Sequence, residues 1–334
     1  MITPSGSNKP MVFNYQQEDF EKWMQKFATH LNSTAEKDRL QYPNELGKGY
    51  AKARTIEPGL SYRIADYVLH TDLEYRRAPS DNFQVILYFY QLSFEESVYC
   101  KIDDTIIESS EKFYSVALMT SSFTSANIIF KKGTRVKGLS VQIDGTWLQE
   151  NMKDFDAYKL ELARQKTYII DVITAKQRKI LDDIFAGFES AYFPELFIKS
   201  RVLRLTEQYL TGVCKRGLSE VPDFTNHKDF HALLKVENML LQNYNGLFPS
   251  IETLAKTALM SESKLKKLFK KAFGLAPYEY YQKNRMHRAK ELLRSRKHSV
   301  TQVGSMLGYQ NMSNFSTAFK KEFDYLPSQV HEIG

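Results

Sequence analysis

Cysteine and histidine are scarce in this 334-residue sequence, and their scarcity excludes several kinds of site. The two cysteines, Cys100 and Cys214, are too few for a disulfide framework or a four-thiolate zinc site, and they suit a reducing cytosol. We expect each to be a small buried apolar residue. Before His227 the only histidines are His30 and His70, so a histidine-rich metal site is not expected.

Segments that carry common chemistry are also missing. The N-terminus has no apolar run resembling a signal peptide, and no stretch approaches the roughly eighteen apolar residues of a membrane span. There is no phosphate-binding glycine loop and no Gly-x-Ser-x-Gly nucleophile elbow. The sequence therefore predicts a cytoplasmic protein with no membrane partner, no cofactor, no metal and no enzymatic activity.

Positive charge is present, and it is concentrated at one end of the chain. The formal net charge is +7. From His227 to Gly334 there are 17 Lys and Arg against 9 Asp and Glu, whereas the remainder has 29 against 30. A basic domain beside a neutral one indicates a polyanion partner for the basic part. The plain alternative is a solvated basic face.

The basic end also contains an internal repeat. Phe269-Lys-Lys-Ala-Phe273 recurs fifty residues later as Phe319-Lys-Lys-Glu-Phe323. Leu265 pairs with Phe315 at the same offset. A repeat of fixed period indicates two copies of one supersecondary unit.

Each copy has the pattern of a helix-turn-helix. In residues 250–273, Ser250 and Ser261 are good N-caps before apolar residues at helical spacing. In residues 299–323, Gly308 supplies the turn because glycine adopts a positive φ without steric cost. Two short helices joined by a turn of about three or four residues form a DNA-binding arrangement whose second helix enters the major groove.

A single long helix is expected between the two copies, from Pro277 to about Arg294. Proline suits the first turn of a helix. About eighteen residues at 1.5 Å each give a rod of about 27 Å. This length is comparable to the roughly 34 Å between successive major-groove faces on one side of DNA. Such a connector would place two recognition helices in adjacent grooves.

These motifs, together with Arg285-Met-His-Arg-Ala-Lys-Glu-Leu-Leu293, resemble the DNA-binding region of the AraC/XylS family of transcription regulators over about residues 227–330. Two positions depart from the family pattern. Leu259 stands where the family usually has the turn glycine, and Gly304 replaces a helix alanine at a cost of up to about 1 kcal/mol. The resemblance implies a sequence-specific regulator that binds double-stranded promoter DNA as a homodimer under control of a small-molecule effector.

The resemblance also assigns roles to the recognition helices. By family position, Ser263, Lys266 and Lys267 should point at base edges, although the lysines could instead bind only phosphates. Thr317 stands where the family often has arginine, so base reading by the second helix should be weaker or more apolar.

The candidate DNA-binding residues comprise the caps and outward faces of both recognition helices and two arginines of the long helix. These arginines are interpreted as partly structural or phosphate-directed. The set is Ser261, Ser263, Lys264, Lys266, Lys267, Lys270, Arg285, Arg288, Asn311, Met312, Ser313, Asn314, Thr317 and Lys320.

From about Gly49 to Ile143 the apolar pattern changes to a period of two. Residues 60–69 alternate, and residues 83–90 form a nearly continuous apolar strand. Six or more such strands with polar or glycine-containing breaks indicate a β-sandwich or barrel. The family usually has a cupin-like effector domain at this position, so the resemblance implies a small barrel with a ligand cavity.

Segments on either side of the strands have other patterns. Residues 1–16 look disordered, and the aromatic residues of 20–31 recur at helical spacing. That amphipathic helix would pack on its own domain or form a dimer contact. Further helices are expected over residues 174–189 and from Pro194, and in the family such helices often pair between subunits.

The N-terminal part has a weaker likeness to pyochelin-type siderophore regulators, which would make the effector siderophore-like. The likeness is carried by Pro58-Gly-Leu-Ser61, by His70-Thr-Asp-Leu-Glu74 and by Val136-Lys-Gly-Leu-Ser140. These short motifs do not identify a ligand.

The predicted fold is α+β and multidomain. Residues 1–145 would form a cupin-like β-barrel or sandwich with an N-terminal helix, and 146–216 a helical dimerisation segment. Residues 217–226 would be a linker, and 227–334 an all-α domain with two helix-turn-helix units joined by a long helix. Two alternatives are a small-molecule-binding or enzymatic barrel with a nonspecific nucleic-acid-binding tail, and an architectural DNA binder without an effector.

Overall fold

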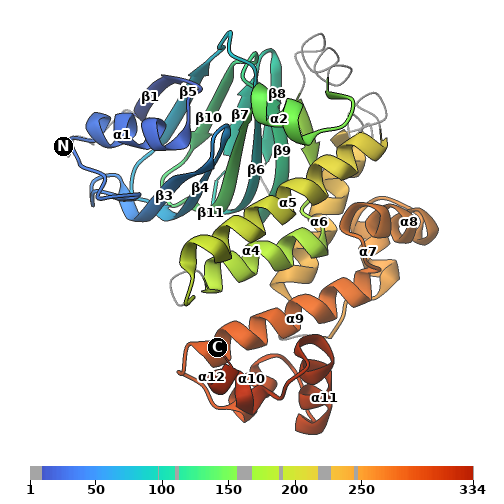
Figure 1. The fold of residues 1–334 in the computed structure, drawn as a ribbon. Helices are drawn as coiled ribbons and strands as arrows, with labels where there is room; N and C mark the ends of the chain where they lie inside the picture. The colour runs from blue at the N-terminus through green and yellow to red at the C-terminus, as the bar shows by residue number, and fades with distance from the viewer. Residues whose placement is uncertain are drawn as a thin grey trace, which may run out of the picture. The chain divides into compact units, whose positions relative to one another are not determined.

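The chain forms two compact units (Figure 1). The computed structural model describes residues 10–96, 98–109, 113–155, 168–187, 191–216, 227–243 and 247–333. The first unit comprises residues 1–173, 180–184 and 191–225, and the second comprises 174–179, 185–190 and 226–334. The predicted linker, 217–226, lies outside the described residues.

The first unit is built on two β-sheets. Its strands are β1 (Met11–Gln16), β2 (Arg39–Gln41), β3 (Gly47–Glu57), β4 (Leu60–Leu69), β5 (Leu73–Ala78), β6 (Gln84–Ser93), β7 (Val98–Ile102), β8 (Thr105–Ser109), β9 (Phe113–Ser121), β10 (Ala126–Phe130), β11 (Arg135–Asp144) and β12 (Tyr168–Asp171). One sheet has the order β1-β5-β10-β7-β8 and the other β12-β9-β6-β11-β4-β3-β2. A β-rich N-terminal part is therefore confirmed.

At β6 both faces of the seven-stranded sheet are covered, which explains why its residues 85–90 are all apolar or aromatic. Tyr88 and Tyr90 face the five-stranded sheet, and Phe89 faces the other way. On that outer side lies α5 (Pro194–Arg216), whose Tyr209 ring meets Phe89 edge-on with the two centroids 5.4 Å apart. Two more helices, α2 (Gly145–Asn151) and α4 (Ala175–Gly187), follow β11 and β12 respectively in sequence.

The aromatic helix α1 (Phe20–His30) packs inside its own unit. Trp23 and Phe27 are fully buried, and the Trp23 ring lies 5.7 Å from Phe13 of β1 and 5.8 Å from Tyr75 of β5. Of the two interpretations of this helix, packing on its own domain is thus confirmed. The aromatic face is not available as a dimer contact.

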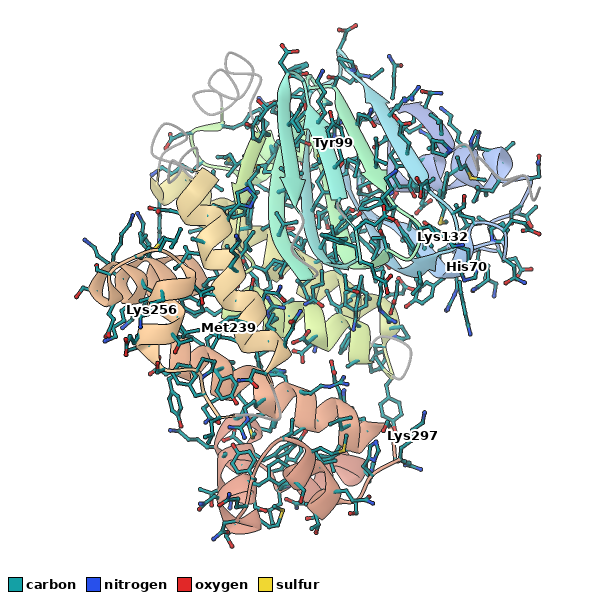
Figure 2. The ribbon with its side chains drawn as sticks, turned by 180° about the vertical axis from the view of Figure 1, so that it is seen from behind. His70, Tyr99, Lys132, Met239, Lys256 and Lys297 are labelled. Carbon is teal, nitrogen blue, oxygen red and sulfur yellow. The ribbon has the colours of Figure 1, made fainter. Side chains whose placement is uncertain are left out.

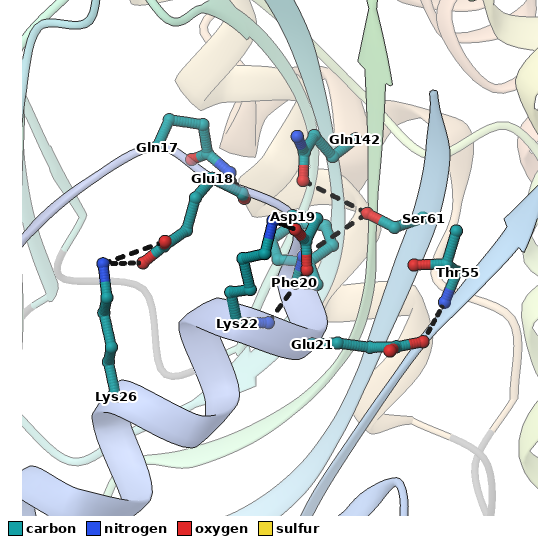
Figure 3. A network of polar contacts seen from close by, with 10 residues as sticks. All are labelled: Gln17, Glu18, Asp19, Phe20, Glu21, Lys22, Lys26, Thr55, Ser61 and Gln142. Atoms are coloured by element: carbon teal, nitrogen blue, oxygen red, sulfur yellow. Dashed lines mark hydrogen bonds and ion pairs between the residues drawn. The ribbon is translucent and has the colours of Figure 1, made fainter. Parts of the chain in front are cut away.

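Polar contacts fix the start of α1 against the seven-stranded sheet (Figure 3). Asp19 caps the helix by accepting from the Lys22 amide at 2.9 Å. The Ser61 hydroxyl of β4 accepts from the Phe20 amide at 3.4 Å and donates to Gln142 at 3.1 Å. These contacts orient the aromatic side chains that close one side of the unit.

The expectation of disorder over residues 1–16 is wrong for its second half. Met11–Gln16 form β1, which pairs in parallel with β5 from Met11 opposite Leu73 to Gln16 opposite Ala78. Residues 1–9 lie outside the described residues. The strand was missed because its partner lies about sixty residues further along the chain, where local patterning gives no signal.

The described C-terminal part of the second unit is helical, as the sequence predicts. Its helices are α6 (His227–Gln242), α7 (Ile251–Thr257), α8 (Glu262–Phe273), α9 (Pro277–Arg294), α10 (Val300–Met306), α11 (Met312–Phe323), the 3₁₀ turn η1 (Pro327–Gln329) and α12 (Val330–Ile333). Within the described ranges, no helix combines the length and apolar character needed to span a bilayer.

Two apolar clusters hold this unit together. Phe269 and Phe273 of α8 pack against Tyr280 of α9 with ring centroids 5.4 and 5.1 Å away. Phe315 and Phe319 of α11 are fully buried among residues of α9, α10 and α12. The helix α9 contributes to both clusters, so it connects the α7–α8 pair to the α10–α11 pair.

Candidate nucleic-acid interface

The helix α8 presents a basic face to solvent. Ser261 caps it by accepting from the Lys264 amide at 3.3 Å. Leu265 and Phe269 are fully buried, and the three- to four-residue spacing leaves the remaining positions outside. The exposed candidates on this helix and its cap are Ser261, Ser263, Lys264, Lys266, Lys267 and Lys270.

The lysines of α8 differ in their partners. Lys264 lies 2.9 Å from a carboxylate oxygen of Asp229, and Lys266 lies 3.3 Å from Glu262. Among the described residues, Lys267 and Lys270 have no carboxylate within 4.0 Å. Exposed ion pairs contribute at most about 1 kcal/mol, so Lys264 and Lys266 can exchange theirs for a phosphate at little cost.

The neighbouring helices α6 and α7 support α8 from behind. Figure 2 labels Met239 of α6 and Lys256 of α7. The Thr257 hydroxyl donates to the Met239 sulfur at 3.8 Å, and Lys256 is exposed beside Glu252 at 2.7 Å. The Thr257–Met239 contact joins α7 to α6, and the Lys256–Glu252 pair remains at the surface.

The helix α11 is polar rather than basic on its outer side. Asn311 caps it by accepting from the Ser313 amide at 2.8 Å and the Asn314 amide at 3.4 Å. Ser313, Asn314, Thr317 and Lys320 are exposed, and Lys320 lies in the last turn.

Met312, expected on the outward face, turns instead toward α10. It is half-buried, and a Cβ added at Gly304 would lie 2.6 Å from its sulfur and 3.2 Å from Cδ1 of Phe315. The thioether and the Phe315 ring thus occupy the space that an alanine methyl would need. Gly304, an apparent departure from the family pattern, fits this packing, because a larger residue would displace the Met312 side chain.

The turns of the two helix pairs differ in their chemistry. Gly308, between α10 and α11, has a φ of 78°, as expected for a turn glycine. Leu259, between α7 and α8, has a φ of 52° and is 94% exposed. A left-handed backbone costs a side-chain-bearing residue about 1–2 kcal/mol, so Leu259 imposes local strain that a glycine would not.

The two candidate arginines of α9 have different environments. Arg285 is 7% exposed, donates to the Leu307 carbonyl and lies 4.4 Å from the centroid of the Tyr309 ring. This burial favours the structural role over phosphate binding. Arg288 is exposed and pairs with Glu291 at 2.8 Å, so it can reach a phosphate.

The Tyr309 hydroxyl contributes to the same arrangement. Burial raises its pKa above the ordinary tyrosine value, although the Arg285 charge opposes the shift. The hydroxyl therefore stays neutral, and it donates to Gln282 at 3.1 Å. Arg285, Tyr309 and Gln282 together fix the turn before α11 against α9.

A buried polar cluster in the second unit was not predicted from the sequence. Arg178 of α4 lies 2.5 Å from Glu237 of α6, and the Tyr280 hydroxyl of α9 donates to the same carboxylate. Burial raises the pKa of Glu237, and the Arg178 charge opposes this shift. The available signal was an acid at position 237 on the same helical face as the apolar Leu233 and Leu241.

The first unit contains a small apolar cavity between its two sheets. Its volume is about 70 Å³, and its lining includes Tyr88, Tyr90, Cys100, Ile128 and Phe130. Both cysteines are reduced thiols and only partly buried, contrary to the expectation of full burial. Burial raises the pKa of the Cys100 thiol to about 12, so it is neutral and unreactive.

The described residues around this cavity include no metal-binding cluster. Within the described part of the chain, no group of three or more His, Cys, Asp and Glu side chains is placed to hold a metal ion. The polar groups beside the cavity are instead arginines and tyrosine hydroxyls.

Comparison with known proteins places the strongest similarity at the C-terminal end. Residues 254–332 match the family described as "Helix-turn-helix domain". The chain is 30% identical over 80 residues to the probable transcriptional regulator LumQ of Photobacterium leiognathi. It is 32% identical over 81 residues to the HTH-type transcriptional activator RhaS of Salmonella arizonae.

The similarity to LumQ and RhaS covers only part of each protein. The alignments cover 24% of this chain in both cases, and 32% of LumQ and 29% of RhaS. The chain thus spans about a third of the length of these relatives. A crystal structure of a transcriptional regulator with an AraC-type DNA-binding domain, from Chromobacterium violaceum, aligns with 33% of this chain and 100% of its own, at 26% identity and a TM-score of 0.29.

Proposed function

Because the C-terminal region of this chain, residues 254–332, is a helix-turn-helix domain of the AraC type, we propose that the protein is a sequence-specific DNA-binding transcription regulator. The observation that carries the proposal is the exposed lysine face of α8 within that domain. The named relatives are transcription regulators, which supports a regulatory rather than an enzymatic role.

In the proposed mode of binding, α8 and α11 enter successive major grooves on one side of the duplex. The helix α9 has 18 residues, hence a length of about 27 Å, against a groove repeat of roughly 34 Å. The lysines of α8 would supply base and phosphate contacts, and Ser313, Asn314 and Thr317 of α11 mainly short polar contacts. Arg288 and Lys320 would reach phosphates.

The proposal extends to the domains. Residues 1–145 would be a cupin-like effector-sensing barrel, 146–216 a helical dimerisation segment, 217–226 a linker and 227–334 the DNA-binding domain. The cavity between the sheets supports an effector site in the barrel. A homodimer would present two such DNA-binding domains to one operator.

Selection from a random DNA pool with the full-length protein tests the proposal. We expect one enriched motif, bound at least about a thousandfold more tightly than a scrambled duplex at physiological salt. Log affinity should fall linearly with log salt because lysine–phosphate contacts release counterions.

A specificity ratio near one with a retained salt slope would contradict the proposal. That result would favour the alternative of a small-molecule-binding or enzymatic barrel with a nonspecific nucleic-acid-binding tail. A matched control is the double variant Lys256→Ala/Lys235→Ala, because both lysines belong to this domain but lie outside α8 and α11. It should retain the selected motif.

A further inference from the structure

Arg77 is a buried cation that has only neutral partners. It is 2% exposed and lies on the inner face of β5. Its Nη1 donates to the hydroxyls of Tyr88 at 3.2 Å and Thr120 at 3.1 Å, and its Nη2 donates to the Thr124 hydroxyl at 2.9 Å. Its Nε is buried without an acceptor. Among the residues that the structure describes, no carboxylate lies within 4.0 Å of the guanidinium.

Arg63, on the facing sheet, likewise has only neutral partners, although its side chain is only partly buried. From β4 its Nη2 donates to the Tyr90 hydroxyl at 2.6 Å and to Ser140 at 3.4 Å. The guanidinium carbon lies 4.2 Å from the centroid of the Trp23 ring, and the Nε is buried without an acceptor. Within the described residues it too has no carboxylate within 4.0 Å.

Both arginines are connected to the cavity through tyrosines. Tyr88 and Tyr90 line it with their ring centroids 5.8 Å apart, and their hydroxyls accept from Arg77 and Arg63 respectively. The rest of the lining is apolar, apart from the neutral Cys100. The cavity is therefore largely apolar, and two positively charged arginines lie behind the tyrosines on one side of it.

This arrangement lacks a negative charge. Burying the Arg77 guanidinium, and partly burying that of Arg63, costs free energy that hydrogen bonds to neutral oxygens return only in part. Tyr88 cannot supply the charge, because burial raises its pKa above the ordinary tyrosine value despite the opposing Arg77 charge. A carboxylate can accept bidentately from a guanidinium, which makes it the anion best matched to an arginine.

We propose that the first unit binds a small apolar monocarboxylate in this cavity, with its apolar body between the sheets and its carboxylate received by Arg77 and Arg63. The inference rests on the effector-sensing role proposed for the unit and specifies the chemical class of that effector. Two cations and an otherwise apolar lining match one carboxylate better than a phosphate, which requires more donors. The cavity enlarges on binding as Tyr88 and Tyr90 turn aside to expose the guanidinium groups.

The first test compares acids with their uncharged amides on the full-length protein without DNA. Butanoate, octanoate and benzoate are paired with butanamide, octanamide and benzamide, and the melting temperature of the first unit is followed by tryptophan fluorescence. Both tryptophans of the chain, Trp23 and Trp147, belong to this unit. At a concentration of about 100 Kd, an acid that binds should raise the melting temperature by about 5 °C or more, and its amide should not.

A failure of the acids to stabilise the first unit more than their amides would overturn the proposal. If none of the three acids raises the melting temperature more than its amide at concentrations up to about 10 mM, the cavity does not bind monocarboxylates. Because no DNA is present, this outcome leaves the proposed transcriptional role intact. A failure to select an operator would conversely leave the acid preference intact.

Variants of Arg77 and Arg63 test whether these side chains bind the carboxylate. Arg77→Met and Arg63→Met should each reduce acid affinity by about tenfold or more while leaving amide binding unchanged. The matched control is Arg76→Met, because Arg76 is the next residue on β5 but is exposed and pairs with Glu74 at 2.6 Å. An acid preference that survives both Arg77→Met and Arg63→Met would overturn the assignment.

Two milder variants keep the test decisive if a methionine variant fails to fold. Arg77→Lys retains the charge, so the preference for acid over amide should persist at reduced affinity. Tyr88→Phe removes a neutral acceptor that competes with the ligand for Arg77, so acid affinity should hold or rise. Loss of the preference in Arg77→Lys together with weaker acid binding in Tyr88→Phe would show that these residues act only in folding.

Discussion

At the scale of single residues, Gly304 shows how packing can override helix propensity. Replacing a helix glycine by alanine commonly stabilises a protein by up to about 1 kcal/mol. At Gly304 the new methyl would meet the Met312 sulfur at 2.6 Å and the Phe315 ring at 3.2 Å. We expect Gly304→Ala to give no net gain in unfolding free energy, because Met312 must be displaced.

Urea unfolding of the full chain measures this effect. Gly212→Ala in α5 is the matched control, because nothing lies within 4 Å of the added Cβ, and it should stabilise by the usual amount. The double variant Gly304→Ala/Met312→Ala should show a favourable coupling of at least about 0.5 kcal/mol. Equal gains at Gly304 and Gly212 would contradict the packing explanation.

Arg285 and Arg288 lie one turn apart on α9 but should respond differently to substitution. Arg285→Met removes a buried donor from the Leu307 carbonyl, so we expect a loss of about 1–3 kcal/mol in unfolding free energy. Arg288→Met breaks only an exposed pair with Glu291 and should change stability by less than about 0.5 kcal/mol.

Unfolding followed by far-ultraviolet circular dichroism gives the stability of both variants, and DNA titration at several salt concentrations gives their phosphate contacts. Arg288→Met should lower the salt slope by about one. A stable Arg285→Met protein with a lowered salt slope would instead make Arg285 a phosphate ligand.

At the scale of elements, the two recognition helices carry different chemistry on equivalent scaffolds. Both have a polar N-cap and a phenylalanine-rich buried face. Exposed lysines dominate α8, whereas α11 offers Ser313, Asn314 and Thr317, which are short and uncharged. We therefore expect α8 to contribute more than α11 to both DNA affinity and base discrimination.

Binding to single-base operator variants at two salt concentrations tests whether α8 contributes more than α11. Lys266→Ala and Lys267→Ala should each remove about 1–3 kcal/mol of discrimination at one position of the first half-site if they contact bases. Thr317→Ala should change the salt dependence little. Preference concentrated in the second half-site, with the lysine variants weakening all sequences equally, would reverse these roles.

At the scale of the whole molecule, the exposed apolar residues at the start of α5 favour this helix as the dimer contact. Tyr192 is 98% exposed, Phe193 73% and Leu196 64%. Clustered large apolar side chains on a surface commonly mark an interaction site. The aromatic face of α1 cannot serve this purpose, because Trp23 and Phe27 are buried in the core.

Sedimentation of the full chain distinguishes these helices. Phe193→Ser/Leu196→Ser should weaken self-association by at least about tenfold while leaving the melting temperature nearly unchanged. Trp23→Ala should destabilise the fold by about 3–5 kcal/mol, because it removes a fully buried ring. A wild-type chain that stays monomeric at high concentration would rule out this contact.

The sequence by itself determined the helices of the C-terminal unit and their caps. The signals are local: Ser250, Ser261, Ser299 and Asn311 each precede an apolar 3–4 pattern, and each accepts from an amide at the start of its helix. The strand-rich character of residues 47–144 followed equally from a period of two. Such features depend on neighbours within one turn or one strand.

Only the tertiary structure decided the features that join distant residues. The strand β1 exists because β5 lies beside it, and Met312 turns inward because Gly304 leaves room on α10. The two arginines of the first unit became visible only when the fold placed Arg77 against Tyr88 and Arg63 against Tyr90, whose rings line one cavity. Local periodicity gives the face of a strand on which a side chain lies, but the charge balance of a core depends on which strands the fold brings together.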